Sequence, residues 1–480
     1  MEYIRKRMCL LGVVAMLGGL TGCNQGFLPE RMAEKRTEEV TVWTYYNGEQ
    51  LESFNRLVDE FNQTVGRDKN IQVTCSSSGN VDDLESDVLA SVEGKVGADP
   101  MPNMFFAYSD NAYMMDQKGL LEDLNPYFTE EEKSLYIDGY LQEGDLWGDG
   151  SLKIFPTAKS TELLFLNETA WKPFAEAVGA SYGDLETLEG LVETAKKYYE
   201  WTDAQTAQAD DGKAFFGRDA MANYILVGAK QLGDTMFEMQ DGKLVVHFEK
   251  ETVRKLWDHY YIPFIKGYFS ACGRFRSDDI KTGNIIAYVG STASAPFFPK
   301  EVASEDGELH PIELKVLPNP YFKDGERYMV QQGAGVAVTH AEKEKVEACI
   351  IFLKWLTQPK WNLMFCADSG YLPVTKEANT PQALTESGIQ ISEEGKSVLE
   401  VASSEIRQSK MYVGRAFSGG RNARDVIEYT MSDAAKADRA DIEERMAQGE
   451  SFEEASSDYL SDAYFDAWYE TTRSKLEQLE

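Results

Sequence analysis

The 480-residue sequence has few of the residues that most often carry catalytic or metal chemistry, with only four histidines and six cysteines. No histidine occurs in a His-Glu-x-x-His motif, and none lies beside a candidate nucleophile. A Gly-x-x-x-x-Gly-Lys-Ser/Thr phosphate loop and a Gly-x-Ser-x-Gly elbow are also missing. The segment around Asp145 and Asp149 lacks the alternating oxygen ligands of a calcium loop. We therefore expect no catalytic residue, no metal site and no cofactor.

Basic residues are few as well: 48 Lys and Arg stand against 80 Asp and Glu, for a net charge of -32. A chain this acidic repels phosphate backbones and anionic lipid headgroups, which argues against nucleic acid and membrane surfaces as direct partners. With 43% hydrophobic residues, the sequence is nevertheless able to bury two or more domain cores.

The cysteines are too widely spaced to form a small disulfide framework. Beyond Cys9 and Cys23, the sequence has four and no Cys-x-x-Cys pair: Cys75, Cys272, Cys349 and Cys366. The sequence alone does not decide whether these cysteines form one or two disulfides. Buried thiols are favoured, above all for Cys349 within the apolar segment EACIIFLKWL.

The apolar run at the N-terminus, residues 8–21, is shorter than the roughly 20 residues that span a bilayer. Arg5, Lys6 and Arg7 precede it, and this order is typical of a secretory signal, predicted over residues 1–22. The sequence Leu20-Thr21-Gly22-Cys23 resembles a bacterial lipobox, and this resemblance implies that Cys23 is lipidated. The alternative is a plain secretory signal with an incidental cysteine. Residues 23–37 are polar and aperiodic, and are predicted to form a tether.

From residue 38 the pattern alternates between strands and helices. The segment EVTVWT is predicted to be a strand, EQLESFNRLVDEFNQTVG an amphipathic helix that ends near Gly66, IQVTC a strand, VDDLESDVLASVEG a helix and PNMFFAY a strand. This order predicts a parallel α/β sheet, in which ligands bind beyond the carboxyl ends of the strands. The loops at those ends carry rings, hydroxyls and amides with little charge: Tyr45-Tyr46-Asn47, Ser78-Gly79-Asn80 and Tyr108-Ser109-Asp110. They favour a polar, uncharged ligand.

Several segments, in this order and spacing, resemble family 1 extracellular solute-binding proteins of bacterial ABC importers. PNMFFAYSDNAYMMDQKGLLEDLNPYF is similar to a family segment, as is IFPTAKSTELLFLNETAW, although Phe165-Leu166-Asn167 replaces the usual Tyr-Asn pair. IKTGNIIAYVGSTAS resembles the family's Gly-x-x-Ala-Met strand, with Ile285-Ile286-Ala287 as a departure. The clearest resemblance is the segment YMVQQGAGVAVTHAEKEKVEACIIFLKWLTQPKWNLMFCADSGYLPV.

The resemblance implies a two-lobe α/β fold of the periplasmic-binding-protein type II, with a hinged cleft between the lobes. By position, the N-terminal lobe is expected at 38–157 plus 314–339. The C-terminal lobe is expected at 158–313 plus 340–480, with a helical tail.

Positions aligned with the family's ligand contacts fall on both expected lobes. On the first lobe they are Tyr45, Tyr46, Asn47, Gly79, Asn80, Tyr108, Asp110, Gln332 and Gly333. On the second lobe they are Ser160, Thr161, Phe216, Arg218, Ser291, Thr292 and Tyr371. Asp110 is either a sugar ligand or the N-cap of the following helix. Thr292-Ala293 stands where the family usually has a tryptophan, which argues against a simple stacked pyranose. Phe105 and Phe106 are expected in the core, and Arg415 either reaches the cleft or lies on the surface.

The resemblance implies a monomeric substrate-binding lipoprotein without enzymatic activity. It would be anchored to the outer face of the cytoplasmic membrane and would deliver a mono- or oligosaccharide to ABC permease subunits. Two alternatives stay open: a surface lipoprotein enzyme acting on polysaccharide, because the 80 acidic residues supply many carboxylate pairs, and a receptor feeding a sensor kinase. A polyol, a phosphodiester or a short peptide also stays open as the ligand.

We expect the Cys23→Ala variant to lose lipidation, because the thiol of Cys23 is the predicted acceptor of the lipid. The variant is then released as a soluble protein or retained with its signal uncut. Membrane fractionation with a mass measurement of the N-terminus tests this. A Cys23→Ala protein that fractionates and migrates like lipidated wild type contradicts the lipobox.

Overall fold

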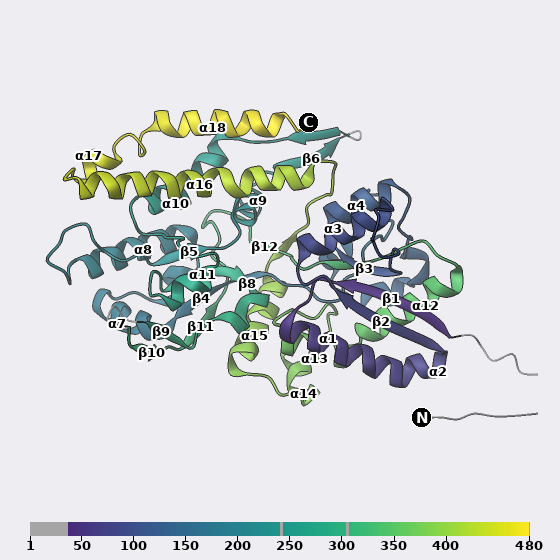
Figure 1. Cartoon of the computed structure of the whole chain (residues 1–480). Helices are drawn as coiled ribbons and strands as arrows, with labels where there is room; N and C mark the ends of the chain where they lie inside the picture. Colours follow the sequence, from purple (N-terminus) through teal and green to yellow (C-terminus); the bar gives the residue numbers. More distant parts are fainter. Residues whose placement is uncertain (1–36, 241–242, 304–306, 480) are drawn as a thin grey trace, which may run out of the picture. The chain divides into compact units, whose positions relative to one another are not determined.

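A computed structural model describes residues 37–240, 243–303 and 307–479 of the chain (Figure 1). The predicted signal, Cys23 and nearly all of the predicted tether lie outside the described residues. Among the residues described, no helix is both long and apolar enough to cross a bilayer.

The first sheet has the strand order β13-β3-β1-β2. Its strands are β1 (Glu38–Thr44), β2 (Ile71–Ser77), β3 (Met104–Ala107) and β13 (Gly335–Val338). β1 pairs in parallel with β2 and with β3, as the alternating pattern predicted, whereas β13 is antiparallel to β3. All four residues of β3 are buried, which confirms that Phe105 and Phe106 are core residues.

Helices that precede and follow these strands bury their apolar faces in one cluster with the sheet, here called the first core. In α1 the buried residues include Phe54, Leu57, Val58 and Phe61, spaced three or four apart as one helix face requires. The helical elements of this part of the chain are α1 (Gly48–Phe61), η1 (Asn62–Gly66), α2 (Arg67–Lys69), α3 (Val81–Val92), α4 (Ser109–Gln117), η2 (Asn125–Tyr127), α5 (Glu130–Ser134), α6 (Asp138–Gln142), α12 (Lys343–Leu356) and α13 (Pro359–Ser369).

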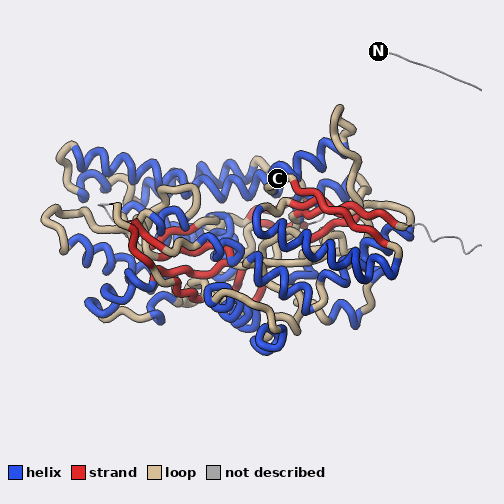
Figure 2. The backbone as a smooth tube through the Cα atoms, turned by 60° about the horizontal axis from the view of Figure 1, so that its bottom comes forward, coloured by secondary structure: helices blue, strands red, loops and turns tan. Residues whose placement is uncertain are grey.

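The second sheet has the strand order β11-β4-β8-β5. Its strands are β4 (Glu162–Asn167), β5 (Phe216–Arg218), β8 (Ala287–Ser291) and β11 (Leu314–Leu317). Every residue of β4 is buried, because both faces of this sheet are covered (Figure 2). Leu164 and Leu166 point to the larger apolar cluster, here called the second core, and Leu163 and Phe165 point to a smaller one.

The remaining elements surround the second sheet or link it to the first. The helical ones are α7 (Glu168–Val178), η3 (Tyr182–Leu185), α8 (Leu188–Asp203), α9 (Met221–Gln231), α10 (Lys250–Ile265), α11 (Arg276–Lys281), η4 (Thr292–Phe297), α14 (Pro381–Ser387), α15 (Glu393–Gln408), α16 (Gly420–Ala447), α17 (Phe452–Ser456) and α18 (Asp462–Glu477). Three two-stranded ribbons pair β6 (Phe237–Gln240) with β7 (Lys243–Val246), β9 (Glu301–Ala303) with β10 (Leu309–Pro311), and β12 (Tyr328–Val330) with β14 (Lys410–Tyr412).

The expected lobe boundaries are wrong for two segments of the chain. β11 was expected with the first lobe, but it pairs with β4 in the second sheet. Residues of α12 and α13 were expected with the second lobe, but they are buried in the first core, where Phe352 and Phe365 pack on Phe54. The reason is that chain position alone does not specify which sheet has an apolar face left to cover.

The four cysteines of the described part of the chain are all free thiols. Cys349 and Cys366 are buried, as expected for Cys349, and burial raises the pKa of the Cys349 thiol to about 12. Cys75 is half-buried and Cys272 is exposed.

The chain passes between the two sheets in three segments, residues 155–161, 330–336 and 371–375, which we call the crossing segments. They are joined by isolated bridges between Phe155 and Val336, between Ser160 and Gln332, and between Lys159 and Leu372. The fully buried ammonium of Lys159 forms an ion pair with Glu143 and donates to the Gly333 carbonyl oxygen at 2.5 Å. A buried cation thus holds two of the crossing segments together.

We expect Lys159→Met to lower the free energy of unfolding by about 3–5 kcal/mol, because it leaves a largely buried carboxylate without its partner. Lys172→Met is the matched control, since its side chain is 59% exposed and pairs with exposed Glu313. Because solvent screens such a pair, that change should leave the free energy of unfolding nearly unchanged. Chemical denaturation of both variants measures the difference, and equal costs contradict a structural role for Lys159.

Candidate functional site

Three tyrosines gather where strands of the first sheet end and a crossing segment begins. Tyr45 follows β1, Tyr108 follows β3, and Tyr371 follows α13. The hydroxyls of Tyr45 and Tyr371 share a hydrogen bond of 3.0 Å, and the Tyr108 hydroxyl is close enough to both to affect their pKa values. We call these three residues the tyrosine cluster.

The hydroxyls of the tyrosine cluster are neutral, as tyrosine is below about pH 10, and burial disfavours their charged form further. Burial raises the pKa of Tyr108 to about 12 and shifts those of Tyr45 and Tyr371 well above the usual value. Neutral phenols both donate and accept hydrogen bonds, and their rings present apolar faces. The cluster therefore suits a partner that has both hydroxyls and C–H surfaces.

Tyr46 lies deeper, in the first core itself. Only 1% of it is exposed, and its ring packs on Phe106 and Phe365 at centroid distances of 5.0 and 5.2 Å. Its ring also packs on the rings of Tyr45 and Tyr371, at centroid distances of 5.0 and 5.8 Å. Tyr46 was predicted as a ligand residue, and its position is that of a core residue.

Asn47, the N-cap of α1, lies next to Gly79 and Asn80 of the loop that follows β2. The amide of Asn47 donates to the Gly79 carbonyl oxygen at 2.8 Å. Gly79 has a φ of +84°, a conformation that glycine adopts at little cost. Asn80 is the N-cap of α3 and accepts from the Asp83 N–H at 2.9 Å. Each residue therefore has a role in the turn.

Asp110 lies in the first turn of α4, whose N-cap is Tyr108. The interpretation of Asp110 as an N-cap is therefore wrong. Its carboxylate is close to Gly420, where an added Cβ would be 2.7 Å from Oδ1. Burial raises the pKa of Asp110, Arg424 and Arg421 lower it, and Glu143 raises it further. Asp110 thus faces charged groups from α6 and α16.

Gln332 and Gly333 lie on a crossing segment next to the tyrosine cluster. Gly333 has a φ of +89°, and a Cβ there would be 3.2 Å from the Tyr371 ring. Within the described ranges, Oε1 of Gln332 is buried without a hydrogen-bond partner. A buried carbonyl oxygen without a partner is costly, so this amide is available to a further donor.

Ser160, Thr161 and Thr292 are buried where the crossing segment enters the second sheet. Ser160 exchanges two backbone hydrogen bonds with Gln332, at 2.9 and 2.8 Å. The Thr161 hydroxyl donates to the Val330 carbonyl oxygen at 2.7 Å, and Thr292 Oγ1 accepts from the Thr161 N–H at 3.4 Å. These hydroxyls hold the crossing segments in register.

Phe216 and Arg218 occupy the short strand β5. Phe216 is 1% exposed and packs on Phe269 with ring centroids 4.9 Å apart, so it is a residue of the second core. The buried guanidinium of Arg218 lies 3.5 Å from Glu162 and over the ring of Tyr224. It compensates the charge of a carboxylate whose pKa burial raises.

A chain of polar contacts leads from Glu162 to α16. Asn223 donates to Glu162 Oε1 at 2.7 Å, and Arg424 donates to Asn223 Oδ1 at 2.6 Å. Arg424 also lowers the pKa values of Tyr108 and Asp110. Arg424 thus interacts on one side with the Asn223–Glu162 pair and on the other side, electrostatically, with Tyr108 and Asp110.

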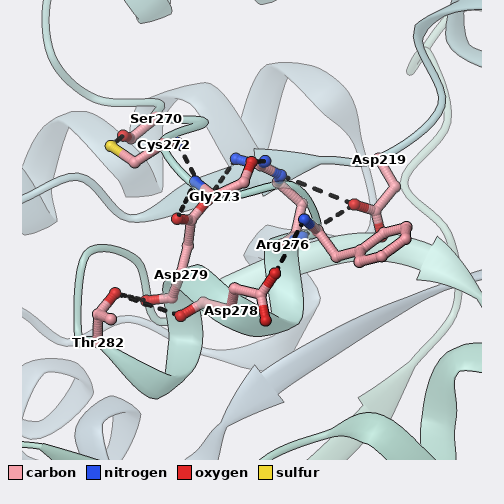
Figure 3. A network of polar contacts seen from close by, with 9 residues as sticks. Asp219, Ser270, Cys272, Gly273, Arg276, Asp278, Asp279 and Thr282 are labelled. Carbon is pink, nitrogen blue, oxygen red and sulfur yellow. Dashed lines mark hydrogen bonds and ion pairs between the residues drawn. The ribbon is translucent and has the colours of Figure 1, made fainter.

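The carboxyl ends of β5 and β8 carry a second polar network (Figure 3). The buried guanidinium of Arg276 pairs with Asp279, and the Arg276 N–H donates to Asp219 Oδ1 at 2.9 Å. Asp279 also accepts from the Gly273 N–H at 2.7 Å. Ser291, which ends β8, accepts from the Ala293 N–H at 3.2 Å and is the N-cap of η4. These bonds fix the loops at this edge of the sheet.

Sequence reasoning missed Glu143, Lys159 and Arg424. Glu143 and Lys159 connect the tyrosine cluster to the crossing segments, and Arg424 approaches from α16. The glycines of the segment VGRAFSGGRNARD indicate a close approach of the backbone to another group. From the sequence, however, Arg415 was the only arginine of this segment proposed to reach the cleft. Arg415 is exposed and donates to the Trp147 carbonyl oxygen at 3.4 Å, which agrees with the surface alternative.

Among the residues that the structure describes, no group of three or more His, Cys, Asp or Glu side chains is arranged to hold a metal ion. The arrangement instead consists of neutral hydroxyls, amides and charges that compensate one another. Such a site is able to bind a polar molecule by hydrogen bonds and ring contacts.

Comparisons with solved structures establish the fold. The cyclic alpha-maltosyl-1,6-maltose binding protein from Arthrobacter globiformis is 17% identical, with a TM-score of 0.66 over 92% of this chain and 99% of that one. UgpB from Mycobacterium tuberculosis, in complex with glycerophosphocholine, is 16% identical, with a TM-score of 0.64 over 92% and 99%. Maltose-bound MalE3 from T. maritima is 16% identical, with a TM-score of 0.61 over 92% and 100%. The two-lobe α/β fold that the sequence predicted is confirmed.

Among curated proteins, no sequence matches this chain. The family model described as bacterial extracellular solute-binding protein matches residues 56–389, well over half of the chain. The chain therefore belongs to the bacterial extracellular solute-binding protein family.

Proposed function

We propose that this protein is the substrate-binding lipoprotein of a bacterial ABC importer, and that it captures a small carbohydrate between its two lobes. The observation that carries the carbohydrate assignment is the tyrosine cluster. Sugars present hydroxyls at their edges and C–H groups on their faces, and tyrosine rings match both. The neutral hydroxyls of Tyr45, Tyr108 and Tyr371 meet at the end of the first sheet, where α/β proteins bind ligands.

Solved proteins of the same fold support this ligand class. The Arthrobacter globiformis protein is named for a cyclic maltosyl-maltose, and the T. maritima protein is bound to maltose. UgpB is in complex with glycerophosphocholine, which makes a phosphodiester the rival ligand. The neutral hydroxyls of the tyrosine cluster favour the sugar, whose own hydroxyls both donate and accept hydrogen bonds, over a phosphate group that only accepts them.

The crossing segments supply a physical basis for lobe closure. We propose lobes of 38–157 plus 330–375 and of 158–329 plus 376–480, because these ranges follow the sheets and cores. The crossing segments would then form the hinge, and a solute that contacts both lobes would stabilise the closed state.

Cys23 would anchor a monomer to the outer face of the membrane, where it would meet its permease, and the protein itself would carry out no reaction.

We expect a sugar from a panel of maltose, maltotriose and cyclic maltosyl-maltose to stabilise the protein. A ligand at 100 times its dissociation constant adds about 2.7 kcal/mol to the free energy of unfolding. A thermal-shift screen followed by calorimetry measures this, with glycerophosphocholine as the rival arm. Stabilisation by glycerophosphocholine alone excludes the carbohydrate assignment, and shortened oligosaccharides after incubation with catalytic amounts of protein indicate the enzyme alternative.

We expect Tyr45→Ala or Tyr108→Ala to weaken binding of the sugar more than tenfold while the protein stays folded. Removing a ring at a binding hot spot costs about 2 kcal/mol, or roughly thirtyfold in affinity. Tyr46→Ala should instead lower the free energy of unfolding by about 3–5 kcal/mol, because its ring is in the core.

Calorimetry gives the affinities, and circular dichroism reports folding. Tyr429→Ala is the control, since this tyrosine of α16 is 56% exposed and its removal should change neither quantity. If Tyr45→Ala and Tyr108→Ala both bind within about twofold of wild type, the tyrosine cluster is not the binding site.

A further inference from the structure

Helix α16 is attached firmly to the second core. Ile427, Met431 and Ala435 are buried there among residues of α9 and α10. The carboxylate of Glu428 accepts hydrogen bonds from the N–H groups of Met221 and Ala222, the first residues of α9, at 3.1 and 2.7 Å. In Figure 1, α16 runs alongside α10, and the two helices are in contact. α16 therefore moves with the second core.

The first turn of the same helix reaches elements of the first core. Arg421 pairs with Glu85 at 2.6 Å and with Asp82 at 2.8 Å, both on α3. α3 itself is held in the first core by Leu84 and Val88. One guanidinium thus links two parts of the chain that are more than 330 residues apart in sequence.

Gly420 permits this close approach. It is buried against Asp110, and a Cβ on residue 420 would lie 2.7 Å from Oδ1 of that carboxylate. The start of a helix carries partial positive charge, which attracts the carboxylate. Burial raises the pKa of Glu85, Arg421 lowers it, and Asp82 and Asp110 raise it further. Without Arg421, these three carboxylates would repel one another.

We propose that the first turn of α16, Gly420 and Arg421, is an electrostatic clamp that grips Asp82, Glu85 and Asp110 and favours the closed arrangement of the lobes. The clamp sets how tightly the protein holds its solute and how that affinity depends on salt. This inference rests on the proposed function, because closure around a solute gives the clamp its effect.

Exposure of the charges determines the size and salt dependence of the effect. The side chains of Arg421 and Asp82 are 52% and 77% exposed, so salt screens their attraction, whereas that of Glu85 is only 20% exposed. An uncharged sugar adds no charge of its own. A fall in affinity with rising salt therefore reports on protein charges that meet when the lobes close.

The test compares Arg421→Glu with wild type by calorimetry, using whichever panel sugar binds, at about 25 and 500 mM NaCl. The variant places a fourth carboxylate beside Asp82, Glu85 and Asp110, which repel it. We therefore expect at least a fivefold rise in Kd at low salt. Wild type should lose about two- to fivefold in affinity between the two salt concentrations, the range of an exposed ion pair. The variant should instead lose no affinity, because salt screens its repulsion.

A charge swap and a matched control isolate the clamp. Arg421→Glu combined with Glu85→Arg re-forms the pair with exchanged partners and should restore Kd to within about threefold of wild type. Arg473→Glu makes the same change of charge on α18, where the side chain is 47% exposed and pairs with Glu470 and Glu477. It should leave Kd unchanged.

The outcomes separate the clamp from the proposed function. The clamp is overturned if Arg421→Glu binds the sugar more weakly and the charge swap does not restore the affinity. It is also overturned if Arg473→Glu weakens binding of the sugar by the same factor. If no sugar in the panel binds, the carbohydrate assignment fails, and small-angle scattering of the sugar-free protein tests the clamp. Arg421→Glu should then have a larger radius of gyration than wild type and Arg473→Glu, and an unchanged radius overturns the clamp.

Discussion

The backbone pairing between the crossing segments is the constraint on which the rest of the structure depends. Ser160 and Gln332 exchange both of their backbone hydrogen bonds, and Lys159 pairs with Leu372 in the same way. Because each segment leads into a strand or helix of one sheet, a shift in this pairing would move both sheets. A buried ammonium would cost several kcal/mol by itself, and Glu143 and the Gly333 carbonyl compensate it only in this register.

The candidate site follows from that register. Tyr371 and Gly333 lie on the crossing segments, whereas Tyr45 and Tyr108 lie at the ends of β1 and β3. The hydroxyls meet only because the third crossing segment passes the carboxyl edge of the first sheet. The site therefore combines rigid strand ends with segments able to serve as a hinge, which suits a protein whose binding and closure are coupled.

Pairing of buried carboxylates with basic residues is the second constraint on the structure. The chain carries 32 more acidic than basic residues, yet three of its buried or largely buried carboxylates have basic partners: Glu162 has Arg218, Asp279 has Arg276, and Glu143 has Lys159. Arg421 and Arg424 extend this pattern to α16, where they act on the carboxylates of Glu85 on α3 and Asp110 on α4. These five basic residues thus lie where carboxylates would otherwise repel one another or remain buried without a partner.

The sequence by itself determined the order β1-α1-β2-α3-β3 and the residues that follow each strand, because the periodicity that specifies strands and helices is local. It also identified two of the three tyrosines, Tyr45 and Tyr108, through the chemistry of the loops. Only the tertiary structure decided that Tyr46 is a core residue whereas Tyr45 meets Tyr371. It also placed α12 and α13 on the first core and brought Gly420 against Asp110. These contacts join residues about 300 positions apart, and they depend on how whole elements pack, which no local pattern encodes.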